Sequence, residues 1–156
     1  MDIDMPDGTG DADYLDALEQ GICHVLATAQ PDVAIYLAGA DPFLGDRLGR
    51  LSLTKEGLQT RDRMVFELCR AASVPVAVAM AGGYSSDIAD TVDIHFSTVE
   101  TAASFWRAAQ HPTSPRGAAD LKPSKRRGTA SLPRFVTSRA LQLSNRAFCF
   151  SNVKNS

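Results

Sequence analysis

Two short, continuously apolar segments constrain the fold of this 156-residue chain most strongly. Residues 33–38 read VAIYLA and residues 74–80 read VPVAVAM, and neither segment contains a charged side chain. Runs of this length are typical of parallel strands that are covered on both faces, whereas a strand with one wet face alternates apolar and polar residues. The sequence therefore predicts two buried parallel strands.

Amphipathic segments precede and follow the two apolar runs. Apolar side chains recur near the helical period over residues 13–28, 57–72 and 87–106. We expect Asp11 and Asp13 to cap the first of these helices and to interact favourably with its dipole. The expected core positions of the second helix are Leu58, Val65, Phe66, Leu68 and Cys69. Alternating helices and buried strands predict an α/β fold, in the form of a partial parallel sheet with flanking helices.

Charge divides the chain into two regions. Residues 1–110 carry 17 acidic and 7 basic side chains, whereas residues 111–156 carry 9 basic side chains and one acidic side chain. Residues 108–133 contain four prolines and have no apolar period, although residues 134–150 regain some apolar content that would suit a short helix or strand. We expect an α/β region over residues 1–110 and a disordered basic tail over residues 111–156.

Composition excludes several classes of protein. The chain has no apolar run near the ~18–20 residues that a membrane-spanning helix needs, and its first residues are acidic where a secretion signal would be basic. The three cysteines are too widely spaced for a disulfide framework or a zinc ribbon. These features predict a cytoplasmic protein without membrane contact, and they leave the oligomeric state open.

The most unusual residues follow the two predicted strands, where ligands gather in open α/β sheets. Gly39-Ala40-Asp41 follows the first strand, and a carboxylate oxygen of Asp41 would suit Zn²⁺ or Mg²⁺. The alternative is an aspartate that only caps its loop. We expect Asp46 and Arg47, in the same loop, to brace it.

The second strand is followed by Gly82, Gly83 and Tyr84. A phenol that projects from such a glycine turn can donate a hydrogen bond to a developing oxyanion. The alternative is an aromatic side chain packed within the loop. The spacing of the two glycines does not match a dinucleotide-binding fingerprint.

These segments resemble the histone deacetylase family, and most closely its bacterial and class IV members. The resemblance covers residues 1–107 and is carried by GAD at 39–41, GDRLG at 45–49, L-x-x-x-G at 53–57, and MAGGYSSDIADTV at 80–92. The stretch DMPDGTGDADYLDAL at residues 4–18 also matches the family pattern. The implied fold is the C-terminal portion of an arginase/deacetylase-like domain.

The resemblance implies a role for each matching residue. Asp41 takes the place of a zinc ligand, and Tyr84 that of the tyrosine that polarises the acyl carbonyl. Gly82 and Gly83 shape the substrate-binding turn that presents Tyr84. The implied activity is zinc-dependent hydrolysis of an N-acyl amide, with acetyl-lysine or another acylated amine as the substrate.

The sequence also departs from the family pattern. Family members have an Asp-x-His that supplies two further zinc ligands and a pair of adjacent histidines for proton transfer, whereas this chain has only His24, His95 and His111. We therefore expect a truncated domain, inactive and poorly stable by itself. The alternative is a non-enzymatic remnant or interaction module, in which the run KPSKRR at 122–127 contacts a polyanion. Nucleic acid is not the expected partner, because that run has no interleaved aromatic residues.

Overall fold

The structure is a computed structural model that describes residues 2–110 and 147–150. Most of the predicted basic tail, including the KPSKRR run, therefore lies outside the described residues. No helix within the described part of the chain is long and apolar enough to cross a membrane.

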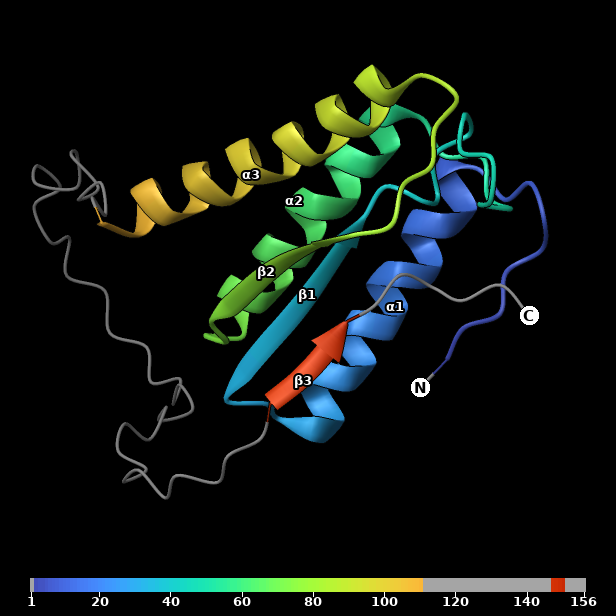
Figure 1. The fold of residues 1–156 in the computed structure, drawn as a ribbon. Coiled ribbons are helices and arrows are strands. Elements are labelled where there is room, and N and C mark those ends of the chain that lie inside the picture. The colour runs from blue at the N-terminus through green and yellow to red at the C-terminus, as the bar shows by residue number, and fades with distance from the viewer. Residues whose placement is uncertain (1, 111–146, 151–156) are drawn as a thin grey trace, which may run out of the picture.

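The order of elements follows the prediction from the sequence (Figure 1). Helix α1 spans Asp11–Ala29, strand β1 spans Val33–Gly39, and helix α2 spans Lys55–Ala71. Strand β2 spans Val76–Ala81, and helix α3 spans Ile88–Gln110. The α/β class is confirmed.

A third strand, β3 (Ala147–Phe150), adds to the sheet from a distant part of the sequence. The strand order is β2-β1-β3, and both pairings are parallel. Tyr36, near the middle of β1, aligns with Val78 of β2 and with Phe150 of β3.

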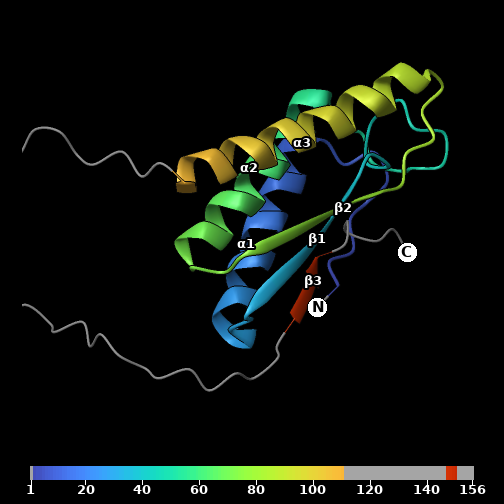
Figure 2. The same ribbon diagram turned by 60° about the vertical axis from the view of Figure 1, so that its left-hand side comes forward.

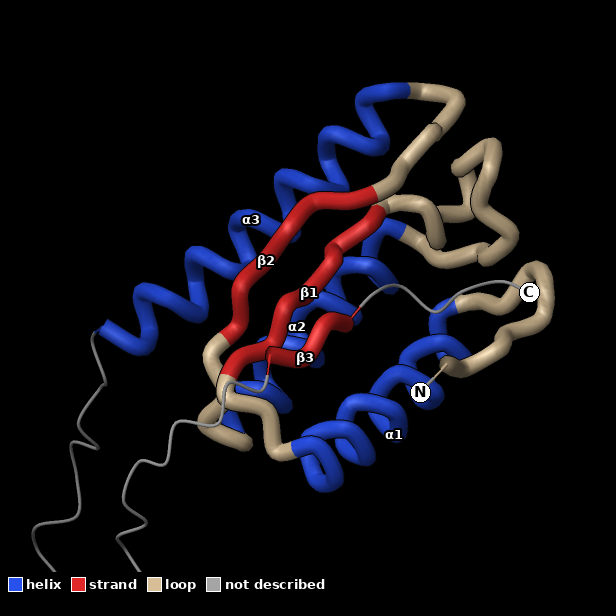
Figure 3. Tube along the Cα trace, turned by 60° about the horizontal axis from the view of Figure 1, so that its bottom comes forward, coloured by secondary structure: helices blue, strands red, loops and turns tan. Residues whose placement is uncertain are grey.

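All three helices pack on the same face of the sheet (Figures 2 and 3). The core there joins Ala34, Tyr36 and Ala38 of β1 to apolar residues of α1 and α2, with partly buried residues of α3 packed alongside. The buried members of this core are Ile22, Ala34, Tyr36, Ala38, Val65, Phe66, Cys69 and Val74. Because all three helices lie on this face, no helix of the described residues covers the other face of the sheet.

The prediction that both strands are buried on both faces is wrong for the described part of the chain. Burial alternates along β1, and Ile35 on its second face is 37% exposed. Strand β2 is more open still, with Met80 65% exposed, because it forms an edge of the described sheet. The apolar runs therefore expose surface that a single layer of helices cannot cover.

Helix α3 also presents apolar side chains to solvent. Val92, Phe96, Val99 and Trp106 are each more than half exposed. Their helical spacing places them along one side of α3. Monomeric soluble proteins rarely expose apolar surface in contiguous patches of this kind.

The expected cap of α1 is wrong in its details. The N-cap position is Gly10, and no side chain caps it. The Asp11 carboxylate instead accepts hydrogen bonds from the Thr54 backbone N–H at 2.9 Å and from its hydroxyl at 2.7 Å. Thr54 is itself the N-cap of α2 and accepts from the Gly57 N–H at 2.9 Å. Asp11 therefore ties the start of α1 to the start of α2.

Candidate active site

The segments that follow β1 and β2 meet at one end of the sheet (Figures 1 and 3). The N–H of Ala40 donates to the carbonyl of Ala81 at 3.2 Å, which extends the strand pairing by one step. Beyond this point, Asp46 and Ser85 form an antiparallel bridge between the two loops. Parallel strands deliver their carboxyl ends to one edge, so residues 40–54 and 82–87 become neighbours there.

Asp41 lies directly against the glycine turn. A Cβ atom built on Gly82 would stand only 2.4 Å from Oδ1 of Asp41, so a side chain at this position would displace the carboxylate. The φ angles of Gly82 (+59°) and Gly83 (+117°) are both in the left-handed range, where side chains are disfavoured. A Cβ on Gly83 would come within 2.8 Å of Thr91 and 3.0 Å of Ala40.

Asp46 and Arg47 hold the backbone of Tyr84. The Tyr84 N–H donates to Oδ2 of Asp46, while its carbonyl accepts from the backbone N–H and Nε of Arg47, each at 3.2 Å. Oδ1 of Asp46 accepts from the N–H groups of Leu48 at 2.8 Å and Gly49 at 2.7 Å. The bracing that the sequence predicts for Asp46 and Arg47 is confirmed. Tyr84 remains 57% exposed, which leaves it accessible to a ligand.

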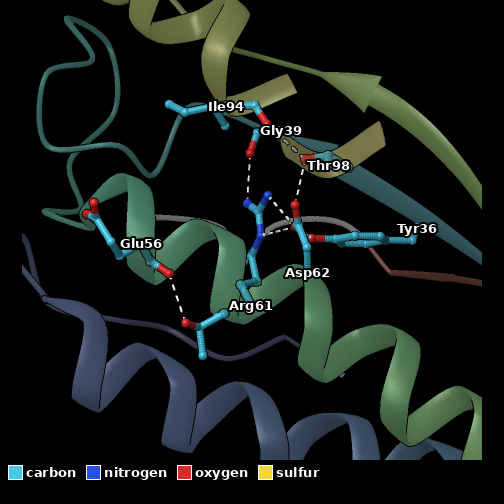
Figure 4. A network of polar contacts seen from close by, with 8 residues as sticks. Tyr36, Gly39, Glu56, Arg61, Asp62, Ile94 and Thr98 are labelled. Atoms are coloured by element: carbon cyan, nitrogen blue, oxygen red, sulfur yellow. Dashed lines mark hydrogen bonds and ion pairs between the residues drawn. The ribbon is translucent and has the colours of Figure 1, made fainter. Parts of the chain in front are cut away.

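A buried polar network anchors β1 beneath this edge (Figure 4). Arg61 and Asp62 of α2 are each 1% exposed and pair with each other at 2.9 Å. Arg61 donates to the carbonyl of Gly39 at 2.7 Å, two residues before Asp41. Asp62 also accepts from the hydroxyls of Tyr36 and Thr98, the latter at 2.6 Å. The network thus connects β1, α2 and α3.

The network is electrostatically self-consistent. Burial raises the pKa of Tyr36 well above its ordinary value and also raises that of Tyr14, so both phenols stay neutral. Burial opposes the charge of Arg61, but the Asp62 carboxylate paired with it raises the pKa of the guanidinium above the usual range. A permanently charged guanidinium is therefore held beside the last residue of β1.

Sequence reasoning missed Arg61 and Asp62. A signal was present, because they fall between Leu58 and Val65 at the three- to four-residue spacing that defines the buried side of α2. Charged residues on such a face indicate a paired, buried network.

The donors that the structure describes do not form a complete metal centre. No group of three or more His, Cys, Asp or Glu side chains comes together among the described residues. Asp41 contributes one carboxylate, whereas a catalytic zinc has about three protein ligands. His24 is exposed on α1, and Nε2 of His95 lies 3.2 Å from the carbonyl of Gly82. His111 lies outside the described residues.

Comparisons with known proteins place the chain in one family. The model of the Histone deacetylase domain matches residues 1–99. An uncharacterized protein of Picosynechococcus sp. is 41% identical over 95 residues, which cover 61% of this chain and 32% of that protein. Histone deacetylase 2 of Arabidopsis thaliana is 32% identical over 95 residues, or 58% of this chain and 24% of that protein.

Histone deacetylase RPD3 of Saccharomyces cerevisiae is 29% identical over 85 residues, which cover 54% of this chain and 19% of that protein. The chain thus spans no more than about a third of the length of these relatives. Because the domain model covers well over half of the 156 residues, the chain belongs to the histone deacetylase family.

Proposed function

We propose that this chain contributes the aspartate and tyrosine part of an acyl-amide hydrolysis site, with acetyl-lysine or another acylated amine as the substrate. The observation that carries the proposal is the contact between the Asp41 carboxylate and Gly82, two residues before Tyr84. It joins the ends of two strands into one unit that presents a carboxylate and an exposed phenol at the ligand-binding edge of the sheet.

Tyr84 is the residue that acts on the substrate in this proposal. Its phenol donates a hydrogen bond to the acyl oxygen as negative charge develops there. The clamp by Asp46 and Arg47 acts on the Tyr84 backbone and leaves the ring exposed, which suits a group that must meet a ligand.

Asp41 would be one ligand of the zinc ion that the family implies, and the other ligands and the proton-transfer groups would come from another part of a deacetylase domain. The exposed edge of β2, the uncovered face of β1 and the apolar side of α3 support this division. They are surfaces that such a part would cover. We accordingly expect the isolated chain neither to hold zinc nor to hydrolyse acyl amides.

A chimaera tests the proposal directly. The part of this chain that aligns with the Picosynechococcus relative would replace the matching 95 residues of that protein, and the unmodified relative would serve as the reference. Zinc would be measured by elemental mass spectrometry after dialysis, and hydrolysis with an acetyl-lysine peptide and an acylated polyamine.

The two site residues should fail in different ways in the chimaera. Asp41→Ala should lose both zinc and hydrolysis, whereas Tyr84→Phe should keep zinc and lose about 10²–10³-fold in kcat. Asp7→Ala, at an exposed carboxylate, is the matched control and should change neither. A Tyr84→Phe chimaera as active as its parent contradicts the proposal. The proposal is also contradicted if the isolated chain binds one equivalent of zinc and loses it in Asp41→Ala, because the full set of zinc ligands would then lie within this chain.

A further inference from the structure

His95 contacts the glycine turn from helix α3. It lies on α3, and its Nε2 is 3.2 Å from the carbonyl oxygen of Gly82. Thr91, one turn earlier on α3, lies against Gly83. Residues four apart share a face of a helix, so His95 and Thr91 contact the glycine turn from the same face of α3.

The turn needs such a contact because its own backbone is permissive. Two consecutive glycines with positive φ place few steric limits on the peptide between them. The direction of the Gly82 carbonyl decides how that peptide is oriented, and hence the direction in which the chain continues to Tyr84. A hydrogen bond to this carbonyl therefore selects one orientation.

Helix α3 is held in place by polar contacts on both sides of His95 in the sequence. Lys55 of α2 pairs with Asp90 at 2.7 Å and with Asp93 at 2.8 Å, which holds the first turns of α3. Three residues after His95, the buried Thr98 hydroxyl donates to Asp62 at 2.6 Å. The imidazole thus projects from a part of α3 that cannot shift without breaking these contacts.

The surroundings of the ring select its tautomer. The Gly82 carbonyl only accepts, so Nε2 must carry the proton. Nδ1 is buried and has no hydrogen-bond partner among the described residues, so a proton there would leave a buried N–H unpaired. The ring is therefore held as an Nε2–H donor.

We propose that His95 is a positioning residue of the candidate site, which orients Tyr84 relative to Asp41 by holding the Gly82 carbonyl. The role of that site rests on the proposed function, but the action of His95 on the turn does not. Asp46 and Arg47 hold Tyr84 from one loop, and His95 holds the residues before it from α3.

The three tyrosines of the chain make the test selective. A full-length sample labelled with ¹⁵N-tyrosine gives one amide signal each for Tyr14, Tyr36 and Tyr84. Tyr36 belongs to the core described above, and Tyr14 belongs to a second buried cluster that includes Leu58 and Ile94. Both therefore report on the global fold, whereas Tyr84 reports on the turn. The readouts are the chemical shift and the hydrogen-exchange rate of each amide, compared among variants of His95.

His95→Phe should shift the Tyr84 amide and speed its exchange about tenfold, the effect of losing one hydrogen bond, with Tyr14 and Tyr36 unchanged. His95→Gln, which can place an N–H near the position of Nε2, should restore most of the wild-type behaviour. His24→Phe, on the exposed side of α1, is the control and should leave Tyr84 unchanged. A Tyr84 signal in His95→Phe that stays at its wild-type position, or moves only in step with both other tyrosines, overturns the proposal.

If His95→Phe does not fold, His95→Gln and His95→Asn decide the question, because asparagine is polar but too short to replace Nε2. Gln and Asn variants that disturb Tyr84 equally, with both other tyrosines in place, would also overturn it. None of these readouts involves zinc or hydrolysis.

In the chimaera, His95→Phe should lower kcat and leave bound zinc unchanged, which separates positioning of the phenol from metal binding. An inactive chimaera would count against the proposed function alone.

Discussion

Replacing Asp62 by asparagine tests whether the buried network sustains the fold. The Asp62 carboxylate accepts from Tyr36, Thr98 and two nitrogens of Arg61, so Asp62→Asn directs an amide toward donors and leaves the guanidinium without its counter-charge. Breaking a buried pair on one side costs about 3–5 kcal/mol. The folded-to-unfolded ratio should therefore fall by about two to four orders of magnitude.

The assay is urea unfolding of the full chain, followed by circular dichroism at the helical wavelength. The matched control is Asp7→Asn, which breaks an exposed pair with Arg50 at 3.3 Å and should cost less than about 1 kcal/mol. The double variant Arg61→Met with Asp62→Leu should be more stable than Asp62→Asn, since replacing both charges leaves neither one buried alone. An Asp62→Asn chain within about 1 kcal/mol of the wild type would refute the reasoning.

Two smaller perturbations test other features of the structure. Gly82→Ala and Gly8→Ala each force an alanine into positive φ, which costs about 1–2 kcal/mol of folding free energy, but only the alanine at position 82 also collides with Asp41. Gly82→Ala should therefore be clearly less stable than Gly8→Ala in urea unfolding. Equal losses of stability would show that the contact between Gly82 and the Asp41 carboxylate is absent. Burial raises the pKa of the Cys69 thiol to about 11, which keeps this thiol neutral at pH 8. Iodoacetamide should therefore modify the exposed Cys23 before Cys69, as measured by peptide mass mapping. Rapid modification of Cys69 in the folded chain would contradict its burial.

Much of the fold was predictable because it depends on periodicity. The helical spacing of Leu58, Val65, Phe66 and Cys69 correctly predicted the buried side of α2. The apolar run from residue 33 correctly predicted β1. Each of these signals arises from neighbours along the chain, and local geometry converts it into an element without reference to the remainder of the fold. The family motifs are likewise local strings of sequence.

The sequence alone determined the α/β class, the order of the elements from α1 to α3, and the choice of Asp41 and Tyr84 as candidate site residues. Only the tertiary structure decided what each polar side chain contacts. Asp11 pairs with Thr54 rather than capping its own helix, and His95 reaches the Gly82 carbonyl from another element. The reason is physical: a periodic pattern specifies which side of an element is buried, but a hydrogen-bond partner is set by how the elements pack in three dimensions.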